Sequence, residues 1–376
     1  MRIPADNVSE FLTRLSPFVD EDGGRNLNKV SQELGIPYQT LRFRMGRLKE
    51  QGIAITPVIE STKFGLSRFR VGFEVSPDLT DYGSFFGGLH QSAGLHFYAR
   101  SLSTHAFDSE FMIPPDKQSE LSKLLYALEE MGFIENVRVR RLLWKEILGM
   151  KSKYYDYVNR VWAIDFSRLV AAPSDYRASP GSRSLSPLER NKYDHIDLQI
   201  IKSLQTDPWT KSVEISKKLN LTDSDISYHM RNHVFGAKMI SGFKFMWIGS
   251  SESWSKHSVI PMMYFFDSLS EETVRHAMSI FTACPFTWNH MLSEEGEYAA
   301  ELIIPVSQMS ETIRYIANGL RPLKLKPTDL SYLDWFCSQN YTIPYLMHRA
   351  DTGWQFDAER SLGHVIQMIR EQSGSR

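Results

Sequence analysis

The sequence predicts an α+β fold in which two winged helix-turn-helix domains alternate with two ferredoxin-like (βαββαβ) sandwiches. The first observation behind this is an internal repeat. The stretch "VSQELGIPYQTLRFRM", which begins at Val30, aligns without a gap with "ISKKLNLTDSDISYHM", which begins at Ile215. The second observation is that the same alternation of strand-like and helix-like segments follows each stretch. A pattern that recurs in order along one chain indicates a tandem duplication.

A later pair of segments supports the duplication. The stretch "EFMIPPDKQSEL" from Glu110 matches "ELIIPVSQMSET" from Glu301, a shift of 191 residues against 185 for the first pair. Further on, "VWAIDF" aligns with "GWQFDA". A chance match between two amphipathic chains would not keep this order.

Each half begins with a predicted three-helix unit. Gly35 ends one helix, as a residue that readily takes positive φ, and Pro37 suits the first turn of the next helix. In the second half Asn220 takes the glycine position, and Thr222 with Asp225 has the spacing of a helix N-cap. The segments "GIAITPVIE" and "ISGFKFMWIG" then follow as candidate wing strands.

The second module of each half reads β-α-β-β-α-β. Expected strands lie near 69–75, 95–101, 107–113 and 135–141, and again near 259–266, 286–292, 298–304 and 322–326. Expected helices lie near 80–92, 116–131, 270–282 and 307–319, and Ser268 with Glu271 has a capping-box spacing. The run from Met262 to Phe266 is apolar without a break, which is typical of a strand buried on both faces.

A Ser-, Pro- and Arg-rich segment separates the halves. We expect five parts: a winged helix-turn-helix domain (1–62), a ferredoxin-like domain with an extension (63–170), the linker (171–190), a second winged helix-turn-helix domain (191–250) and a second ferredoxin-like domain with an extension (251–370). The net charge of −1 confines any nucleic-acid surface to a local patch. Two cysteines and the polar N-terminal stretch indicate a cytoplasmic protein.

The third helix of the first half carries such a patch. Residues 25–51 hold six basic and two acidic side chains. Leu41, Met45 and Leu48 form the stripe that packs inward, and the rest of the helix surface offers base and phosphate contacts. The expected DNA-binding residues are Gln39, Thr40, Arg42, Phe43, Arg44, Arg47 and Lys49, and a weaker second set is Ser227, Tyr228, Arg231 and Asn232.

The order of helix-turn-helix, wing and βαββαβ sandwich resembles the Lrp/AsnC family of feast/famine transcription regulators. "VSQELGIPYQTLRFRMGRLKEQGI" is similar to that family's DNA-reading head, and "ISKKLNLTDSDISYHMRNHVFGAKMIS" is a weaker version of it. The resemblance implies a sequence-specific regulator of transcription that binds double-stranded DNA, self-associates through the sandwiches within the chain or as a homodimer, and responds to a small-molecule effector. The alternative is a protein-interaction scaffold with degenerate helix-turn-helix modules. No catalytic set, cofactor or membrane contact is expected.

Three further patterns contain side chains that are capable of chemistry. His229 and His233 have a spacing compatible with a metal, but no third ligand is evident nearby, so no metal site is expected. "MLSEEGEY" indicates a turn between two strands rather than a carboxylate site. Trp162 and Trp354, each followed by an aspartate three residues later, fit core tryptophans with capping acids better than an effector pocket.

Overall fold

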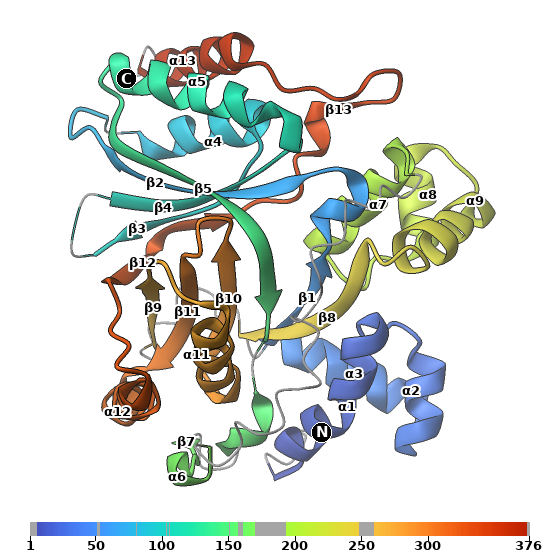
Figure 1. The fold of residues 1–376 in the computed structure, drawn as a ribbon. Coiled ribbons are helices and arrows are strands. Elements are labelled where there is room, and N and C mark those ends of the chain that lie inside the picture. The colour runs from blue at the N-terminus through green and yellow to red at the C-terminus, as the bar shows by residue number, and fades with distance from the viewer. Residues whose placement is uncertain are drawn as a thin grey trace.

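The computed structural model describes residues 6–50, 53–79, 81–102, 104, 106–149, 151–156, 161–169, 193–247 and 259–373. Within them the chain is α+β, and helical units lie beside a closed barrel of eight strands (Figure 1). The predicted linker at 171–190 lies outside the described residues. None of the described helices combines the length and the hydropathy that crossing a bilayer would require.

The elements of the two halves follow the same order. The first half contains α1 (Asp6–Asp22), α2 (Leu27–Leu34), α3 (Tyr38–Glu50), β1 (Ile53–Ile59), β2 (Ser67–Val75), α4 (Tyr82–Ala93), β3 (Leu95–Ser101), β4 (Ala106–Ile113), α5 (Gln118–Glu130), β5 (Ile134–Ile147), β6 (Tyr155–Asp156), β7 (Val161–Trp162) and α6 (Phe166–Leu169). The second contains α7 (His195–Thr206), α8 (Ser212–Leu219), α9 (Asp223–His229), a π-helix (Met230–Phe235), β8 (Ile240–Trp247), β9 (Val259–Phe266), α11 (Glu271–Ala283), β10 (Thr287–Ser293), β11 (Tyr298–Pro305), α12 (Met309–Leu320), β12 (Asp329–Asn340), β13 (His348–Arg349), β14 (Gly353–Trp354) and α13 (Ala358–Ser373).

Short-range capping chemistry sets several helix ends where the sequence predicts them. Gly35 and Asn220 close α2 and α8 in the left-handed conformation, at φ values of 65° and 55°. Thr222 and Asp225 form a reciprocal capping box at the start of α9. The predicted cap at Ser268 is wrong, because Ser270 caps α11 by accepting the Thr273 N–H.

The two three-helix units share a single core. The predicted stripe of Leu41, Met45 and Leu48 is buried, and it belongs to the same apolar cluster as residues of α7 and α9. The strands predicted as wings also join the two units. The strand after each unit, β1 or β8, pairs antiparallel with the other, so that Ile55 faces Phe245. A lone strand leaves its backbone groups unpaired, and pairing across the halves satisfies them.

Two long strands close the barrel. Its strand order is β10-β11-β9-β12-β3-β4-β2-β5, and β5 returns to β10. The first part of β5 pairs with β2 and the last part, residues 142–147, pairs with β10. β12 does the same between β9 and β3. Each half therefore supplies one strand that belongs to both sheets, and neither sheet keeps a free edge there.

The last strand of the second half is not where the pattern placed it. The expected strand near 322–326 is a short 3₁₀ turn (Arg321–Leu323) followed by irregular chain, and β12 begins at Asp329. The physical reason is that β12 passes between two sheets. Its residues are mostly half-buried or exposed rather than alternately buried, so its sequence lacks the period of a half-exposed strand.

The apolar run in β9 faces two different interiors. Met262, Tyr264 and Phe266 pack against the helices of their own half. Met263 and Phe265 point the other way, where they meet Arg70 of β2, a strand that is not a neighbour of β9 in the sheet. Strands that are not neighbours can meet only across the barrel interior. The run is apolar throughout because both of its faces are covered.

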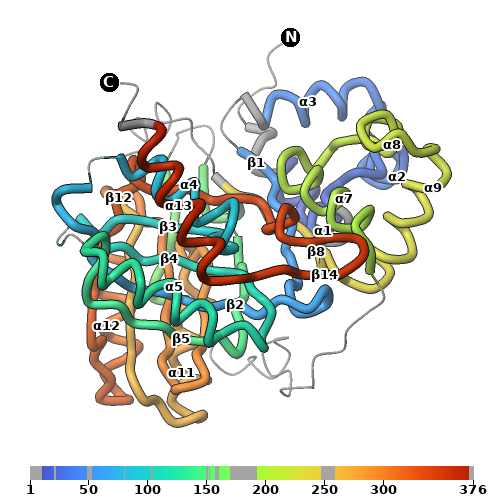
Figure 2. Tube along the Cα trace, turned by 90° about the horizontal axis from the view of Figure 1, so that it is seen from above, coloured from blue at the N-terminus to red at the C-terminus, as the bar shows by residue number. Residues whose placement is uncertain are grey.

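The extensions after each sandwich cross over to the other half. Trp162 packs on Phe286 and Phe166 on Tyr315, so the first extension covers the second sandwich. α13, from the chain's end, lies against α4 and α5 of the first half (Figure 2), and its Ser361 hydroxyl donates to the Ser92 carbonyl at 2.7 Å. The two halves are thus joined by shared strands and by exchanged helices.

The position of Met263 gives a test of the barrel. We expect Met263→Ala to lower the free energy of unfolding by about 2–4 kcal/mol, because the side chain is 1% exposed and its removal leaves a cavity. The control is Met131→Ala, at a methionine that is 48% exposed, with an expected change within about 0.5 kcal/mol. Urea denaturation measures both changes. Equal losses in the two variants would contradict the burial of Met263 inside the barrel.

Candidate functional site

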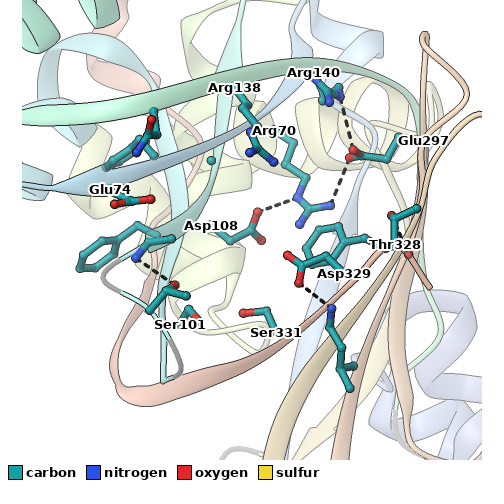
Figure 3. A pocket seen from close by; sticks show the side chains of 18 of the residues that line it. Arg70, Glu74, Ser101, Asp108, Arg138, Arg140, Glu297, Thr328, Asp329 and Ser331 are labelled. Carbon is teal, nitrogen blue, oxygen red and sulfur yellow. Dashed lines mark hydrogen bonds and ion pairs between the residues drawn. The ribbon is translucent and has the colours of Figure 1, made fainter.

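A cavity of about 390 Å³ opens at one end of the barrel. Strand ends from both halves line it: β2, β4 and β5 from the first, and the ends of β9, β11 and β12 from the second (Figure 3). Its wall includes the aromatic ring of Phe265 and the charged side chains of Arg70, Glu74, Asp108, Arg138, Arg140, Asp267, Glu297 and Asp329. A cavity of this size is within the range that holds small-molecule ligands.

The period of two along each strand directs charged side chains into the barrel. Arg70 and Gly72 are two positions apart on β2, and Arg138 and Arg140 are two apart on β5. The register sets Arg70 beside Arg140 and Gly72 beside Arg138. A Cβ at Gly72 would meet only the Phe107 carbonyl oxygen at 4.0 Å, so the missing side chain leaves open space in the cavity.

Arg70 is the central buried charge of this wall. Its Nε donates to Asp108 Oδ1 at 2.6 Å, and its Nη1 lies 3.8 Å from a carboxylate oxygen of Glu297 (Figure 3). Its guanidinium carbon lies 4.1 Å from the ring centre of Phe265, close enough for a cation–π contact. Carboxylates from both halves and a ring from β9 thus hold one arginine in place across the barrel.

The other two arginines are more available to a ligand. Arg140 Nε lies 3.4 Å from Glu297 Oε2, and the Arg140 side chain is about one-third exposed. Arg138 is exposed, and the described residues offer it no hydrogen bond or ion pair. A guanidinium presents planar donors that match a carboxylate. The cavity therefore has one fixed arginine and two that can receive an anionic group.

Glu297 is the titratable group with the most altered chemistry in the cavity. Burial raises the pKa of its carboxyl, and the nearby carboxylates of Asp267 and Asp108 act in the same direction. Arg70 and Arg140 oppose the shift without reversing it. A carboxyl with a raised pKa keeps its proton to a higher pH than usual, which suits a group that donates a proton.

A second ionic cluster lies deeper in the barrel. The Glu110 carboxylate is 3% exposed, and it pairs with Arg68 and with Lys145 Nζ, the latter at 2.7 Å. Burial alone would raise the pKa of Glu110, but the two cations hold that pKa well below its usual range. The neighbouring His96 is buried, and burial lowers its pKa to about 3. This cluster has no open face to the cavity, so we assign it to the stability of the barrel.

The residues predicted to bind DNA lie elsewhere. On α3, Gln39, Thr40, Arg42, Phe43 and Arg47 are exposed. Arg44 instead packs with its guanidinium 5.5 Å from the Phe11 ring centre, and the Lys49 side chain is outside the described set. In the second half Tyr228, Arg231 and Asn232 are exposed, and Ser227 is partly buried. Neither set contributes to the wall of the barrel cavity.

The cavity residues were missed although the sequence contains a signal. "SRFRVGFEV" places Arg68, Arg70 and Glu74 at alternate positions of a predicted strand, and "NVRVRR" repeats the pattern with Arg138 and Arg140. Rows of charge at period two indicate a polar sheet face, and such a face is usually exposed to solvent rather than turned toward an interior. The turn predicted in "MLSEEGEY" is present, and its Glu297 lines the cavity. The tryptophan prediction is confirmed for Trp354, whose indole donates to the Phe64 carbonyl at 2.7 Å.

Comparisons with known proteins show which fold the chain shares. No protein-family model matches the sequence, and no curated protein matches it. Among solved structures, the siroheme decarboxylase NirDL matches with a TM-score of 0.56 at 12% identity, over 96% of this chain and 99% of NirDL. NirDL in complex with an iron-uroporphyrin III analogue matches with a TM-score of 0.51 at 12% identity, over 95% of this chain and 99% of that one. The similarity covers the whole architecture and establishes a shared fold.

These findings correct the functional predictions from the sequence. The identification as an Lrp/AsnC-like transcription regulator is wrong, and so are double-stranded DNA as the partner and the alternative of an interaction scaffold. The expectation that the chain is not an enzyme is wrong as well, since the full-length structural match is a decarboxylase. The error arose because the predicted helix-turn-helix units were given a function from their pattern alone, although a fold can serve several functions.

The raised pKa of Glu297 predicts a pH dependence of stability. The folded state holds this proton more tightly than the unfolded state, so the wild type loses stability as the pH rises from the ordinary glutamate value, 4.5, through the raised pKa. Glu297→Gln removes the titration. We therefore expect the stability of the variant, relative to wild type, to increase as the pH rises above the ordinary glutamate value of 4.5 in denaturant unfolding.

Glu294 provides the matched control for this experiment. It lies in the same turn, and its side chain is 42% exposed beside Arg141. Glu294→Gln should leave the pH profile of stability close to that of wild type. A Glu297→Gln profile that stays parallel to the wild-type profile would contradict a raised pKa.

Proposed function

We propose that this protein is an enzyme that binds a carboxylate-bearing iron tetrapyrrole at the barrel cavity and removes carboxyl groups from it as carbon dioxide. The observation that carries the proposal is the combination in one cavity of two accessible arginines, Arg138 and Arg140, with the partly buried carboxyl of Glu297, whose pKa is raised. Support for the substrate class comes from NirDL, a siroheme decarboxylase whose fold matches nearly the whole chain and which was solved with an iron-uroporphyrin III analogue.

The wall of the cavity suits such a ligand in two ways. The Phe265 ring offers apolar surface to a flat conjugated ring, and the arginines offer donors to its carboxylates. A volume of about 390 Å³ accepts the carboxylate-bearing edge of a tetrapyrrole rather than the whole ring. The wall also contains several carboxylates. They would repel anionic groups, so a substrate carboxylate could bind only where an arginine faces it.

The chemistry requires a proton and no redox partner. In decarboxylation the bond between the carboxyl carbon and its neighbour breaks, and the electron pair stays on the neighbouring carbon. The conjugated ring of the substrate delocalises that pair. Glu297 then donates its proton to this carbon, a new C–H bond forms, and solvent reprotonates Glu297. The raised pKa of Glu297 keeps the proton available for that step.

We also propose a finer architecture and location. The two three-helix units are helix-turn-helix modules retained as structural supports, and each barrel half is a ferredoxin-like sandwich whose last strand is shared. The domain boundaries expected from the sequence are also part of this proposal. So is a cytoplasmic location, which is supported by the free state of Cys284 and Cys337.

Binding of iron-uroporphyrin III to the purified protein tests the substrate class. We expect saturable changes in the absorbance of the porphyrin, and a Kd that Arg138→Gln weakens by about tenfold or more, because a charge-assisted hydrogen bond contributes about 1.5–3 kcal/mol. The control is Arg275→Gln on α11, which removes an exposed arginine paired with Glu271. Loss of affinity in both variants alike, or no binding at all, would contradict a tetrapyrrole site at the cavity.

The same preparation tests the reaction. Incubation with siroheme should give products that have lost carbon dioxide, as identified by mass spectrometry. Glu297→Gln should keep the wild-type affinity for the porphyrin within a few-fold and should slow product formation by about 100-fold or more, the usual contribution of a general acid. Turnover by Glu297→Gln at the wild-type rate would refute the role of this carboxyl.

A further inference from the structure

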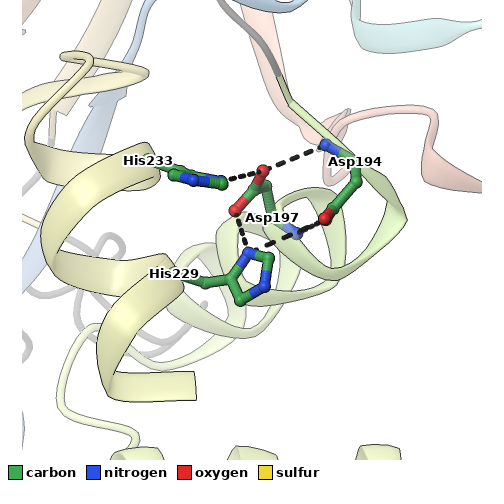
Figure 4. A group of neighbouring side chains, drawn as sticks. All are labelled: Asp194, Asp197, His229 and His233. Carbon is green, nitrogen blue, oxygen red and sulfur yellow. Dashed lines mark hydrogen bonds and ion pairs between the residues drawn. The ribbon is translucent and has the colours of Figure 1, made fainter. Parts of the chain in front are cut away.

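A second cluster of chemically active side chains lies far from the barrel cavity, in the second three-helix unit. His229, at the end of α9, and His233, in the π-helix, project toward Asp197 of α7, and Asp194 lies at the start of α7 (Figure 4). The sequence suggested the two histidines but no third ligand. The structure supplies two candidates from a helix more than 30 residues earlier.

We propose that these four residues form a binding site for a divalent transition metal such as Zn²⁺ or Co²⁺. Their potential ligand atoms all lie within 4.8 Å of one another. His229 Nδ1 is 2.9 Å from Asp197 Oδ1, and His233 Nδ1 is 3.0 Å from Asp197 Oδ2. Bonds of about 2.0–2.2 Å to a tetrahedral metal separate adjacent ligands by roughly 3.3–3.6 Å, so small side-chain movements would admit the ion.

The charges and the ligand types fit this kind of ion. Two carboxylates and two neutral imidazoles give a set whose charge of −2 a divalent cation neutralises. Asp197 is fully buried, and a buried carboxylate needs a partner of opposite charge or several hydrogen bonds. Its carboxylate accepts from both imidazoles and from the Asp194 N–H at 3.0 Å, among the residues described. A metal at this point would supply the missing positive charge.

The ion has a route into the site. Asp194 is exposed, and the side chains of His229 and His233 are 13% and 26% exposed, so solvent reaches one side of the cluster. Asp194 Oδ1 lies 3.8 Å from His229 Nδ1, and it also accepts the N–H groups of Ile196 and Asp197, which hold this carboxylate beside the histidines. When the metal binds, each imidazole carries its proton on Nε2 and offers the lone pair of Nδ1.

The local backbone is consistent with a specialised site. α9 passes directly into a π-helix at Met230, and single-turn π segments occur often at functional sites. The cluster connects the first and third helices of one unit. A bound metal would therefore stabilise that unit, since it binds the folded chain and the unfolded chain lacks the preformed set.

Isothermal titration of the full-length apoprotein with Zn²⁺ tests the proposal, and the visible spectrum with Co²⁺ reports the ligand geometry. We expect one ion per chain, a rise of several degrees in Tm with Zn²⁺, and intensified Co²⁺ bands typical of four-coordinate N and O ligation. His229→Gln, His233→Gln and Asp194→Asn should each weaken Zn²⁺ binding by about 100-fold or more. Asp194 is exposed, so its variant tests the site even if a histidine variant is poorly folded.

His276→Gln on α11 is the matched control, because this histidine is exposed and outside the cluster. It should bind Zn²⁺ as wild type does. The proposal is overturned if the wild type binds no Zn²⁺, or if the three cluster variants bind it as well as His276→Gln does; in that case Asp197 and the histidines form only hydrogen bonds. No tetrapyrrole enters this experiment, so its result is separate from that of the proposed enzymatic function.

Discussion

The closure of the barrel by two shared strands is the constraint on which the rest of the structure depends. β5 starts in the sheet of the first half and ends in that of the second, and β12 makes the reverse passage. Once both strands are shared, the inner faces of the two sheets bound a single interior. The exchanged extensions reinforce the closure, because each helix layer is completed by chain from the other half.

A shared interior explains why charge lies where a sandwich core would be apolar. Glu110 pairs with Arg68 and Lys145, and Arg70 pairs with Asp108. Removing one partner from a buried pair leaves an uncompensated charge and costs about 3–5 kcal/mol. These ion pairs therefore depend on the closed barrel. The inward-facing positions of the same strands continue to the open end of the barrel. There Arg138 and Arg140 come within reach of solvent, and the cavity begins.

The elements of the fold were largely predictable because they depend on short-range patterns. Gly35, Asn220 and Thr222 mark helix ends by local backbone chemistry, and the strands of the first half follow a period of two. β12 was misplaced because its residues face two sheets in turn. The pairing of β1 with β8 could not be predicted, since it joins strands about 190 residues apart that each resemble a wing.

The candidate sites were much less predictable than the fold. Glu297 and Arg70 are 227 residues apart, and only the closed barrel brings them within 3.8 Å. Asp197 reaches His229 and His233 only through the packing of α7 on α9. A sequence pattern shows neither kind of proximity. The one pattern that suggested a function, the basic third helix, describes an exposed surface that has no part in the cavity.

The central claim is that the barrel cavity is the tetrapyrrole site, and the position of the iron tests it most directly. A crystal structure of the protein with iron-uroporphyrin III, recorded at the iron absorption edge, locates the metal by its anomalous scattering. The account predicts one strong iron peak at the mouth of the barrel, with porphyrin carboxylates on Arg138 and Arg140 and with Glu297 beside the ring. An iron peak outside the cavity, or a cavity empty of porphyrin in saturated crystals, would contradict it.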